Sequence, residues 1–256
     1  MVSQAWRLDL PRSVYIALAV TVWLIYVSDR LYDVWKSARR GLEYLLETRH
    51  EFHYRNRGWF LLAAVITSVV LLRLLLFVLP RELMVSSIVP LTMTAGYFVF
   101  SAVMKSVSKP GLDRVPFGKN MLAGFTFAFG IAAAAFSFTE TNLLFLTYPE
   151  ILCMGLLFVL NITVIDLWRE LRESSEPDDT VLLEAAISLP LILLAVFSLW
   201  QMVNVQGGER YLFGALFLSS AALQLLNTQR HRFSSDTLNI LADVALLLPV
   251  PVFFLL

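Results

Sequence analysis

Two pairs of acidic residues occur where long apolar stretches of the sequence end. Asp29 and Asp33 follow the first stretch, and Asp166 and Glu170 close the fifth. Residues four apart share one face of a helix, so each pair would present two carboxylates to the same side. Carboxylates at the edge of a bilayer are costly unless paired or hydrated, and Mg²⁺ prefers oxygen ligands that it shares with substrate phosphates. The two pairs therefore predict a Mg²⁺ site; the alternative is that they are ordinary helix-end charges in solvent.

Basic residues occur near the same ends of the apolar stretches. Lys105 ends the third stretch, Lys119 and Asn120 begin the fourth, and Arg49 lies in the segment before the second. Fixed cations beside a metal–phosphate centre would neutralise a departing diphosphate, and Lys119 is the strongest candidate because it lies at a helix start. The alternative for each of these cations is the general excess of Lys and Arg in cytoplasmic loops.

The elements that carry these residues are predicted to be apolar helices. Of 256 residues, 58% are hydrophobic and 16% are charged, whereas a soluble domain carries about a quarter charged residues. A helix needs about 20 apolar residues to cross a bilayer. Eight stretches qualify or nearly so: 11–29, 59–80, 83–104, 119–138, 147–167, 180–203, 209–227 and 236–256. The predicted fold class is all-α, a polytopic transmembrane helix bundle of about eight spans that forms a single domain over residues 1–256. The first helix is expected to continue past its apolar part into Asp33.

The distribution of basic residues predicts the orientation in the membrane. Fifteen of the twenty Lys and Arg residues fall at or after the ends of the first, third, fifth and seventh stretches. Because short cytoplasmic loops are enriched in Lys and Arg, these ends are expected on the cytoplasmic side and both termini on the other side. The acidic pairs then lie near the cytoplasmic face. A formal net charge of zero argues against nucleic-acid binding, and the one cysteine, Cys153, excludes a disulfide within the chain.

At these residues the chain resembles the UbiA superfamily of intramembrane prenyltransferases. That family carries an NDxxDxxxD motif at the cytoplasmic end of one helix and a DxxxD motif four spans later. Asp29 and Asp33 match the latter part of the first motif. Asp166 and Glu170 match the second, with Glu in place of the final Asp. The resemblance covers residues 15–250.

The chain departs from the family pattern in its first motif. Ile25 and Tyr26 stand where the family has its leading Asn and Asp, and neither can bind Mg²⁺ in the same way. The motif also ends the first span rather than the second, as though the family's first helix were absent. Such a loss would place the N-terminus outside and keep both motifs cytoplasmic, which is the orientation that the basic residues predict.

The resemblance implies a Mg²⁺-dependent enzyme that ionises an allylic isoprenyl diphosphate in a central cavity open near the cytoplasmic side. Its metal ligands would be Asp29, Asp33, Asp166 and Glu170. The leaving diphosphate would be stabilised by Lys119, Lys105, Arg39, Arg40 and Arg49. The other residues expected at the substrate are Asn120, Asn161, Tyr26 and Trp23. Aromatic faces attract a carbocation, which suits the last two.

Two outcomes of such a reaction stay open from the sequence. Most of the superfamily transfers the prenyl group to an apolar or aromatic acceptor, which makes transfer the leading interpretation. Some members instead cyclise farnesyl or geranylgeranyl diphosphate without an acceptor. No set of residues in this chain marks an acceptor site, so cyclisation is the close alternative.

A non-catalytic membrane protein, such as a transporter or a scaffold, is the alternative of a different class. Arg73 lies inside the second stretch, and Asn239 and Asp243 are four apart in the eighth, where a buried helix–helix pair is favoured over a polar path. His50 and His53 are interpreted as interfacial histidines rather than a metal site. Compact loops and the lack of a transit peptide favour the cell membrane of a prokaryote.

Overall fold

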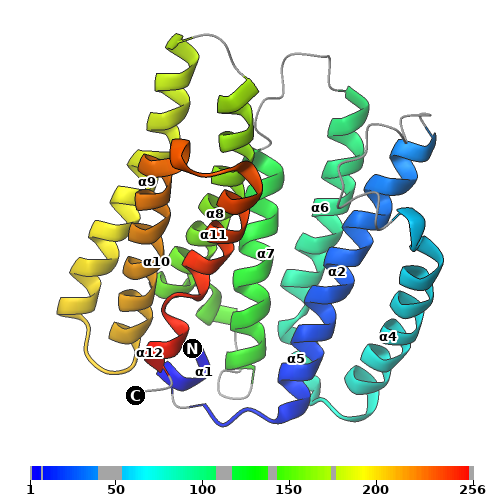
Figure 1. Cartoon of the computed structure of the whole chain (residues 1–256). Coiled ribbons are helices and arrows are strands. Elements are labelled where there is room, and N and C mark those ends of the chain that lie inside the picture. The colour runs from blue at the N-terminus through cyan, green and yellow to red at the C-terminus, as the bar shows by residue number, and fades with distance from the viewer. Residues whose placement is uncertain are drawn as a thin grey trace. The chain divides into compact units, whose positions relative to one another are not determined.

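The computed structural model describes residues 2–6, 8–39, 54–107, 117–137, 143–173 and 177–253. Every regular element in these residues is a helix (Figure 1). In chain order they are α1 (Val2–Ala5), α2 (Arg12–Arg39), α4 (Arg57–Phe77), α5 (Arg81–Ser86), α6 (Ile88–Val107), α7 (Phe117–Phe136), the 3₁₀ turn η2 (Leu143–Thr147), α8 (Pro149–Glu173), α9 (Pro177–Asn204), α10 (Glu209–Gln229), the 3₁₀ turn η3 (Arg230–Arg232), α11 (Ser235–Leu247) and α12 (Val250–Phe253). The predicted all-α fold class is confirmed.

Seven helical segments of the described chain are long and apolar enough to cross a membrane. They are Arg12–Tyr32, Arg57–Phe77, Arg81–Ser101, Phe117–Phe136, Pro149–Leu171, Glu184–Asn204 and Glu209–Arg232. The third of them combines α5 with the first part of α6. Seven such helices are compatible with a multi-pass membrane protein, as the composition predicts.

The eighth predicted span is not a single crossing helix in the described residues. In the stretch 236–256, α11 ends at Leu247 after 13 residues, and α12 begins at Val250. A helix of 13 residues is about 20 Å long, whereas the apolar core of a bilayer is about 30 Å thick. Pro249, which lacks a backbone N–H, lies between the two helices and interrupts the hydrogen-bond ladder.

The contacts divide the chain into two compact units. Unit 2 comprises Leu10–Met84, and unit 1 comprises Met1–Asp9 together with Val85–Leu256. The division falls within α5. The prediction of a single domain over residues 1–256 stays a prediction.

Unit 2 is built on α2 and α4, which pack against each other. The helix α2 continues without a break from Arg12 to Arg39, so the prediction that the first helix passes its apolar part and reaches Asp33 is confirmed. None of the side chains of α4 is buried. Large apolar residues such as Trp59, Val65 and Phe77 are exposed along it. This is the pattern of a helix whose surroundings are lipid tails rather than water.

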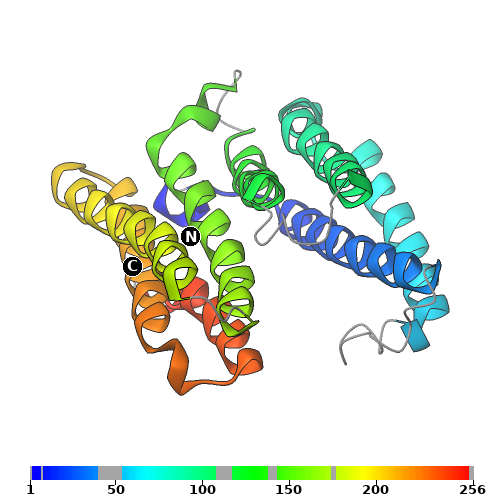
Figure 2. The same cartoon turned by 90° about the horizontal axis from the view of Figure 1, so that it is seen from above.

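Unit 1 is organised around α8. This helix contacts α7 on one side and α9, α10 and α11 on the other, and Figure 2 shows it between α7 and α9. The helices α9 and α10 form an antiparallel pair, and α11 returns beside α10 toward the end of the unit where α1 lies (Figure 1). Both described ends of the chain therefore lie at the same end of unit 1.

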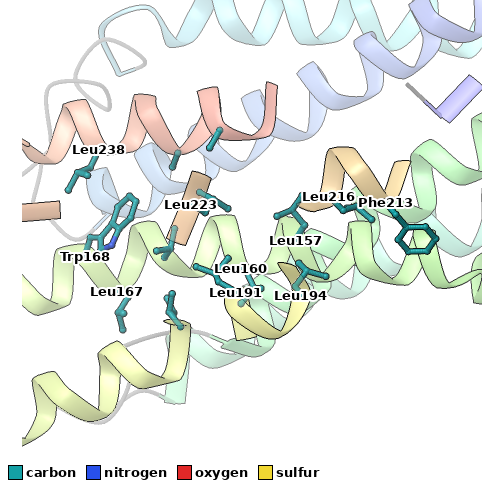
Figure 3. Close-up of a cluster of buried hydrophobic side chains, with 14 residues drawn as sticks. Leu157, Leu160, Leu167, Trp168, Leu191, Leu194, Phe213, Leu216, Leu223 and Leu238 are labelled. Atoms are coloured by element: carbon teal, nitrogen blue, oxygen red, sulfur yellow. The ribbon is translucent and has the colours of Figure 1, made fainter. Parts of the chain in front are cut away.

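One apolar cluster joins α8, α9, α10 and α11 (Figure 3). Its fully buried members include Leu167 and Val164 from α8, Leu191 from α9, Leu223 from α10 and Leu238 from α11. Side chains fill the space between these four helices, so the predicted central cavity is not found within this cluster of described residues. The cluster holds in place the end of α8 that carries Asp166 and Glu170.

Candidate functional site

The acidic end of α8 is joined to the start of α7 by hydrogen bonds. Asn120 of α7 is 2% exposed, and its Nδ2 donates to Oδ2 of Asp166 at 2.9 Å. The same amide nitrogen lies 3.2 Å from Oγ1 of the buried Thr163, one turn before Asp166. The Asn120 amide thus orients the Asp166 carboxylate, and Glu170 follows one helical turn later on the same face. The sequence predicted Asn120 and Asp166 for one site, and the structure brings them together.

Two glycines allow α7 and α8 to approach closely beneath this site. A Cβ atom at Gly124 would lie 2.5 Å from the backbone nitrogen of Val159, and one at Gly155 would lie 2.5 Å from the ring of Phe125. Small residues at a helix contact in a membrane let the two backbones come together, which shortens the distance between polar side chains on the two helices. Since Gly124 lies one turn after Asn120, the close contact sets the distance that the Asn120–Asp166 hydrogen bond spans.

Lys119 lies at the start of α7, next to Asn120. Its Nζ is 5.1 Å from the centre of the Tyr97 ring of α6, which is the geometry of a cation–π contact. The side chain is partly exposed. Lys119 therefore places a positive charge directly before Asn120, the residue that binds Asp166. The ring of Tyr97 restricts the Lys119 ammonium group. The predicted role of Lys119 at a diphosphate stays a prediction.

Asn161 is buried in the middle of α8, at 5% exposure. Its Oδ1 accepts no hydrogen bond from the described residues. The residue precedes Asp166 by about one and a half turns, on a helix that contacts α7, α9, α10 and α11. Its predicted role of lining a substrate cavity stays a prediction.

A second polar network lies on the other side of the same turn of α8. Trp168 donates from Nε1 to Oδ1 of Asn227 in α10 at 2.8 Å. Asn227 in turn donates from Nδ2 to Oγ of Ser188 in α9 at 3.0 Å. Asn227 is 2% exposed and Trp168 is 3% exposed, whereas Ser188 is partly exposed, so a buried amide connects three helices. Asn227 was not predicted as a functional residue from the sequence, although an Asn inside an apolar span indicates a hydrogen-bonded contact between helices.

An ion pair extends this network to the end of the helices. Arg230, the first residue of η3, pairs with Glu184 of α9 and donates to the carbonyl oxygen of Asn227 at 3.1 Å. Both charged side chains are partly exposed, which limits the stability that the pair contributes. The pair connects the residue that follows α10 to the N-terminal part of α9.

Asn227→Leu is expected to lower the free energy of unfolding by about 1–2 kcal/mol. The change leaves the indole N–H of Trp168 buried without an acceptor, and polar contacts between membrane helices contribute roughly 0.6–2 kcal/mol. Denaturation in mixed detergent micelles measures the effect. The matched control is Asn204→Leu, because Asn204 is exposed at the end of α9 and bonds only within its own helix. A loss no larger than that of the control would contradict the importance of the network.

The predicted residues of unit 2 lie along α2. Asp29 is half-buried, Trp23 is partly exposed and Tyr26 is exposed. The guanidinium carbon of Arg30 lies 5.1 Å from the centre of the Tyr26 ring, one turn away on the same helix. Asp33 belongs to the same helix, one turn after Asp29, but its side chain is outside the described part of the structure.

Other predicted residues have no described side chain. Lys105 lies in α6 and Arg39 is the last residue of α2, and only their backbones are described. Arg40 and Arg49 fall outside the described residues, as do His50 and His53. The roles predicted for these residues at a diphosphate or a metal stay predictions.

The predicted metal site combines residues of both units. Asp29 and Asp33 belong to unit 2, whereas Asp166 and Glu170 belong to unit 1. Among the residues whose side chains are described, no three His, Cys, Asp or Glu form a group that could hold a metal ion. Because the side chain of Asp33 is not among them, the four-carboxylate site stays a prediction. Its donor set fits Mg²⁺, since all four ligands would be carboxylate oxygens.

None of the polar residues that favoured a non-catalytic protein is buried in this structure. Asp243 of α11 and Arg73 of α4 are exposed, and Asn239 is partly exposed. The predicted buried pair of Asn239 and Asp243 is therefore wrong. The cause is that α11 turns Leu238, Ala242 and Ala245 inward, and Asp243 comes one residue after this buried stripe.

Comparison of the chain with models of protein families, with curated proteins and with solved structures finds no match.

Proposed function

We propose that this chain is a Mg²⁺-dependent intramembrane enzyme that ionises an allylic isoprenyl diphosphate and transfers the prenyl group to an apolar or aromatic acceptor. The observation that carries the proposal is the carboxylate of Asp166, which the buried amide of Asn120 orients at the end of an apolar helix bundle. The cation of Lys119 lies next to this amide in the sequence and contacts an aromatic ring.

The arrangement differs from that of an ordinary helix-end charge. A solvated Asp needs no partner, whereas Asp166 accepts a hydrogen bond from an amide that is itself buried. Only one of its oxygens, Oδ2, takes part in that bond, and within the described residues Oδ1 has no hydrogen-bond donor. Carboxylates that bind metal ions are commonly oriented by a hydrogen bond from a neighbouring group, and Asp166, with Oδ2 bonded to Asn120 and Oδ1 open, has this arrangement.

The residues of the chain would act on the diphosphate and on the apolar tail in different ways. Asp166 and Glu170, with Asp29 and Asp33, would hold Mg²⁺, which would stabilise charge on the leaving diphosphate when bound. Lys119 would add a fixed positive charge at the same group. The apolar helices would take the isoprenoid tail out of water and so protect a carbocation from hydrolysis.

The experiment that tests this function is product analysis with the purified protein in lipid nanodiscs. Farnesyl and geranylgeranyl diphosphate are supplied with Mg²⁺, with and without an aromatic acceptor, and both diphosphate release and organic products are measured. Prenylated acceptor supports transfer. Hydrocarbon or alcohol formed without an acceptor supports cyclisation, the alternative reaction. No diphosphate release from either substrate, with or without acceptor, would contradict the proposed enzyme and favour a transporter or a scaffold.

A further inference from the structure

A groove opens on the surface of unit 1 between α9 and α10. Its volume is about 380 Å³. The lining is largely apolar and includes Val196 and Leu199 of α9 and Phe217 of α10, while the polar residues that line it are Gln224 and Thr228 of α10. Ala195 of α9 and Ala221 of α10 leave space for the groove because neither side chain extends beyond Cβ.

The length of the groove matches one leaflet of a bilayer. Phe217 lies near the middle of the candidate span Glu209–Arg232, and Thr228 lies near its end. The eleven residue steps from Phe217 to Thr228 correspond to a rise of about 16 Å along a helix. Half of the apolar core of a bilayer is about 15 Å thick. The groove therefore extends from the middle of the membrane to one surface, as a single acyl chain does.

A positive charge follows the surface end of the groove. The turn η3 contains Arg230, His231 and Arg232 directly after α10. Arg230 is engaged by Glu184, whereas Arg232 is exposed and forms no ion pair with the described residues. Arg232 comes four residues after Thr228, so in the chain it lies about one turn beyond the last residue that lines the groove.

We propose that this groove binds an anionic phospholipid, with one acyl chain between α9 and α10 and the phosphate at Arg232. The groove fits a lipid rather than an isoprenyl diphosphate for two reasons. It is open along its side to the surface of the bundle, where residues such as Val196 and Leu225 are exposed. In addition, Glu184, the carboxylate of the polar network at this end of α9 and α10, is already paired with Arg230, so it is not open to bind a metal ion together with a diphosphate. The inference is independent of the proposed enzymatic function.

Native mass spectrometry of the detergent-purified full chain, titrated with phosphatidylglycerol or phosphatidylcholine, tests this site. The wild-type protein is expected to bind phosphatidylglycerol about fivefold more tightly than phosphatidylcholine, since one basic residue near the membrane surface contributes about that factor. Arg232→Gln is expected to remove the preference, and Arg232→Lys to keep it. Ala221→Phe, which fills the groove, is expected to reduce the binding of phosphatidylglycerol to the level of non-specific lipid.

The controls separate this groove from general lipid contact. Arg210→Gln removes the same charge from the opposite end of α10, and Val203→Phe enlarges an exposed residue of α9 outside the groove. Both are expected to leave the preference unchanged. Equal affinity for the two lipids, equal effects of Arg210→Gln and Arg232→Gln, or displacement of phosphatidylglycerol from this site by an equimolar amount of farnesyl diphosphate would overturn the proposal.

Discussion

Asp166→Asn is expected to reduce diphosphate release from an isoprenyl diphosphate by about a hundredfold or more, as is typical when one group that stabilises a leaving charge is removed. The substitution removes the negative charge but keeps the shape of the side chain. The amide oxygen of the new Asn can still accept the hydrogen bond that Asn120 donates to Oδ2 of Asp166, so the contact between α7 and α8 is retained. Steady-state measurement of diphosphate release, with folding checked by thermal unfolding, gives the effect.

The same exchange at two other positions makes this test specific. Asp29→Asn is expected to cause a loss of similar size, because Asp29 belongs to the other acidic pair. Asp243→Asn is the matched control, since Asp243 is an exposed carboxylate of α11 and lies outside the predicted site. Activity that survives in Asp166→Asn, or that falls equally in all three variants, would be inconsistent with the proposed metal ligands.

Gly124→Ala is expected to lower the free energy of unfolding by about 2–3 kcal/mol and to reduce activity with it. The new Cβ would lie 2.5 Å from the backbone nitrogen and from Cγ2 of Val159, and 2.9 Å from its Cα. A backbone cannot move aside as a flexible side chain can, so α7 and α8 must separate, and overpacking of this kind costs about 1–3 kcal/mol or more. The separation would also stretch the Asn120–Asp166 hydrogen bond one turn away.

Gly130→Ala in the same helix is the control for this effect. The nearest atom to a Cβ at Gly130 is Cβ of Pro90, at 4.0 Å, which is an ordinary contact. Alanine is the better helix former by about 0.5–1 kcal/mol, so this variant is expected to be as stable as the wild type or slightly more stable. Detergent denaturation of both variants measures the difference. A Gly124→Ala protein as stable as Gly130→Ala would show that the close packing of α7 on α8 is not required.

Features that depend on the local sequence were predictable. The length of the apolar stretches predicted the helices, and the continued helical pattern after Asp29 predicted that α2 would extend through Asp33, as it does. The prediction was wrong for the last stretch, 236–256, where hydrophobicity alone indicated a helix that crosses the whole bilayer. Pro249 and Pro251 were the signal for a break, because a proline inside a helix removes a hydrogen bond and clashes with the preceding turn.

Contacts between helices were harder to predict from the sequence. That Asn120 would face Asp166 follows from the start of α7 and the end of α8 lying together, but the participation of Thr163 depends on the rotation of both helices. Asn227 was missed because its partners, Trp168 and Ser188, are 59 and 39 residues away in the chain. Spacing within one helix carries no information about such distances.

The proposed function requires the acidic pairs of α2 and α8 to serve one metal–diphosphate site. Electron paramagnetic resonance of Mn²⁺, used in place of Mg²⁺ with a non-ionising thio analogue of farnesyl diphosphate, measures metal bound to the purified protein. We expect tight, analogue-dependent binding of Mn²⁺ that is lost in Asp29→Asn and also in Asp166→Asn, and that persists in Asp243→Asn. Binding that survives either of the first two substitutions, or that is absent from the wild-type protein, would contradict the claim.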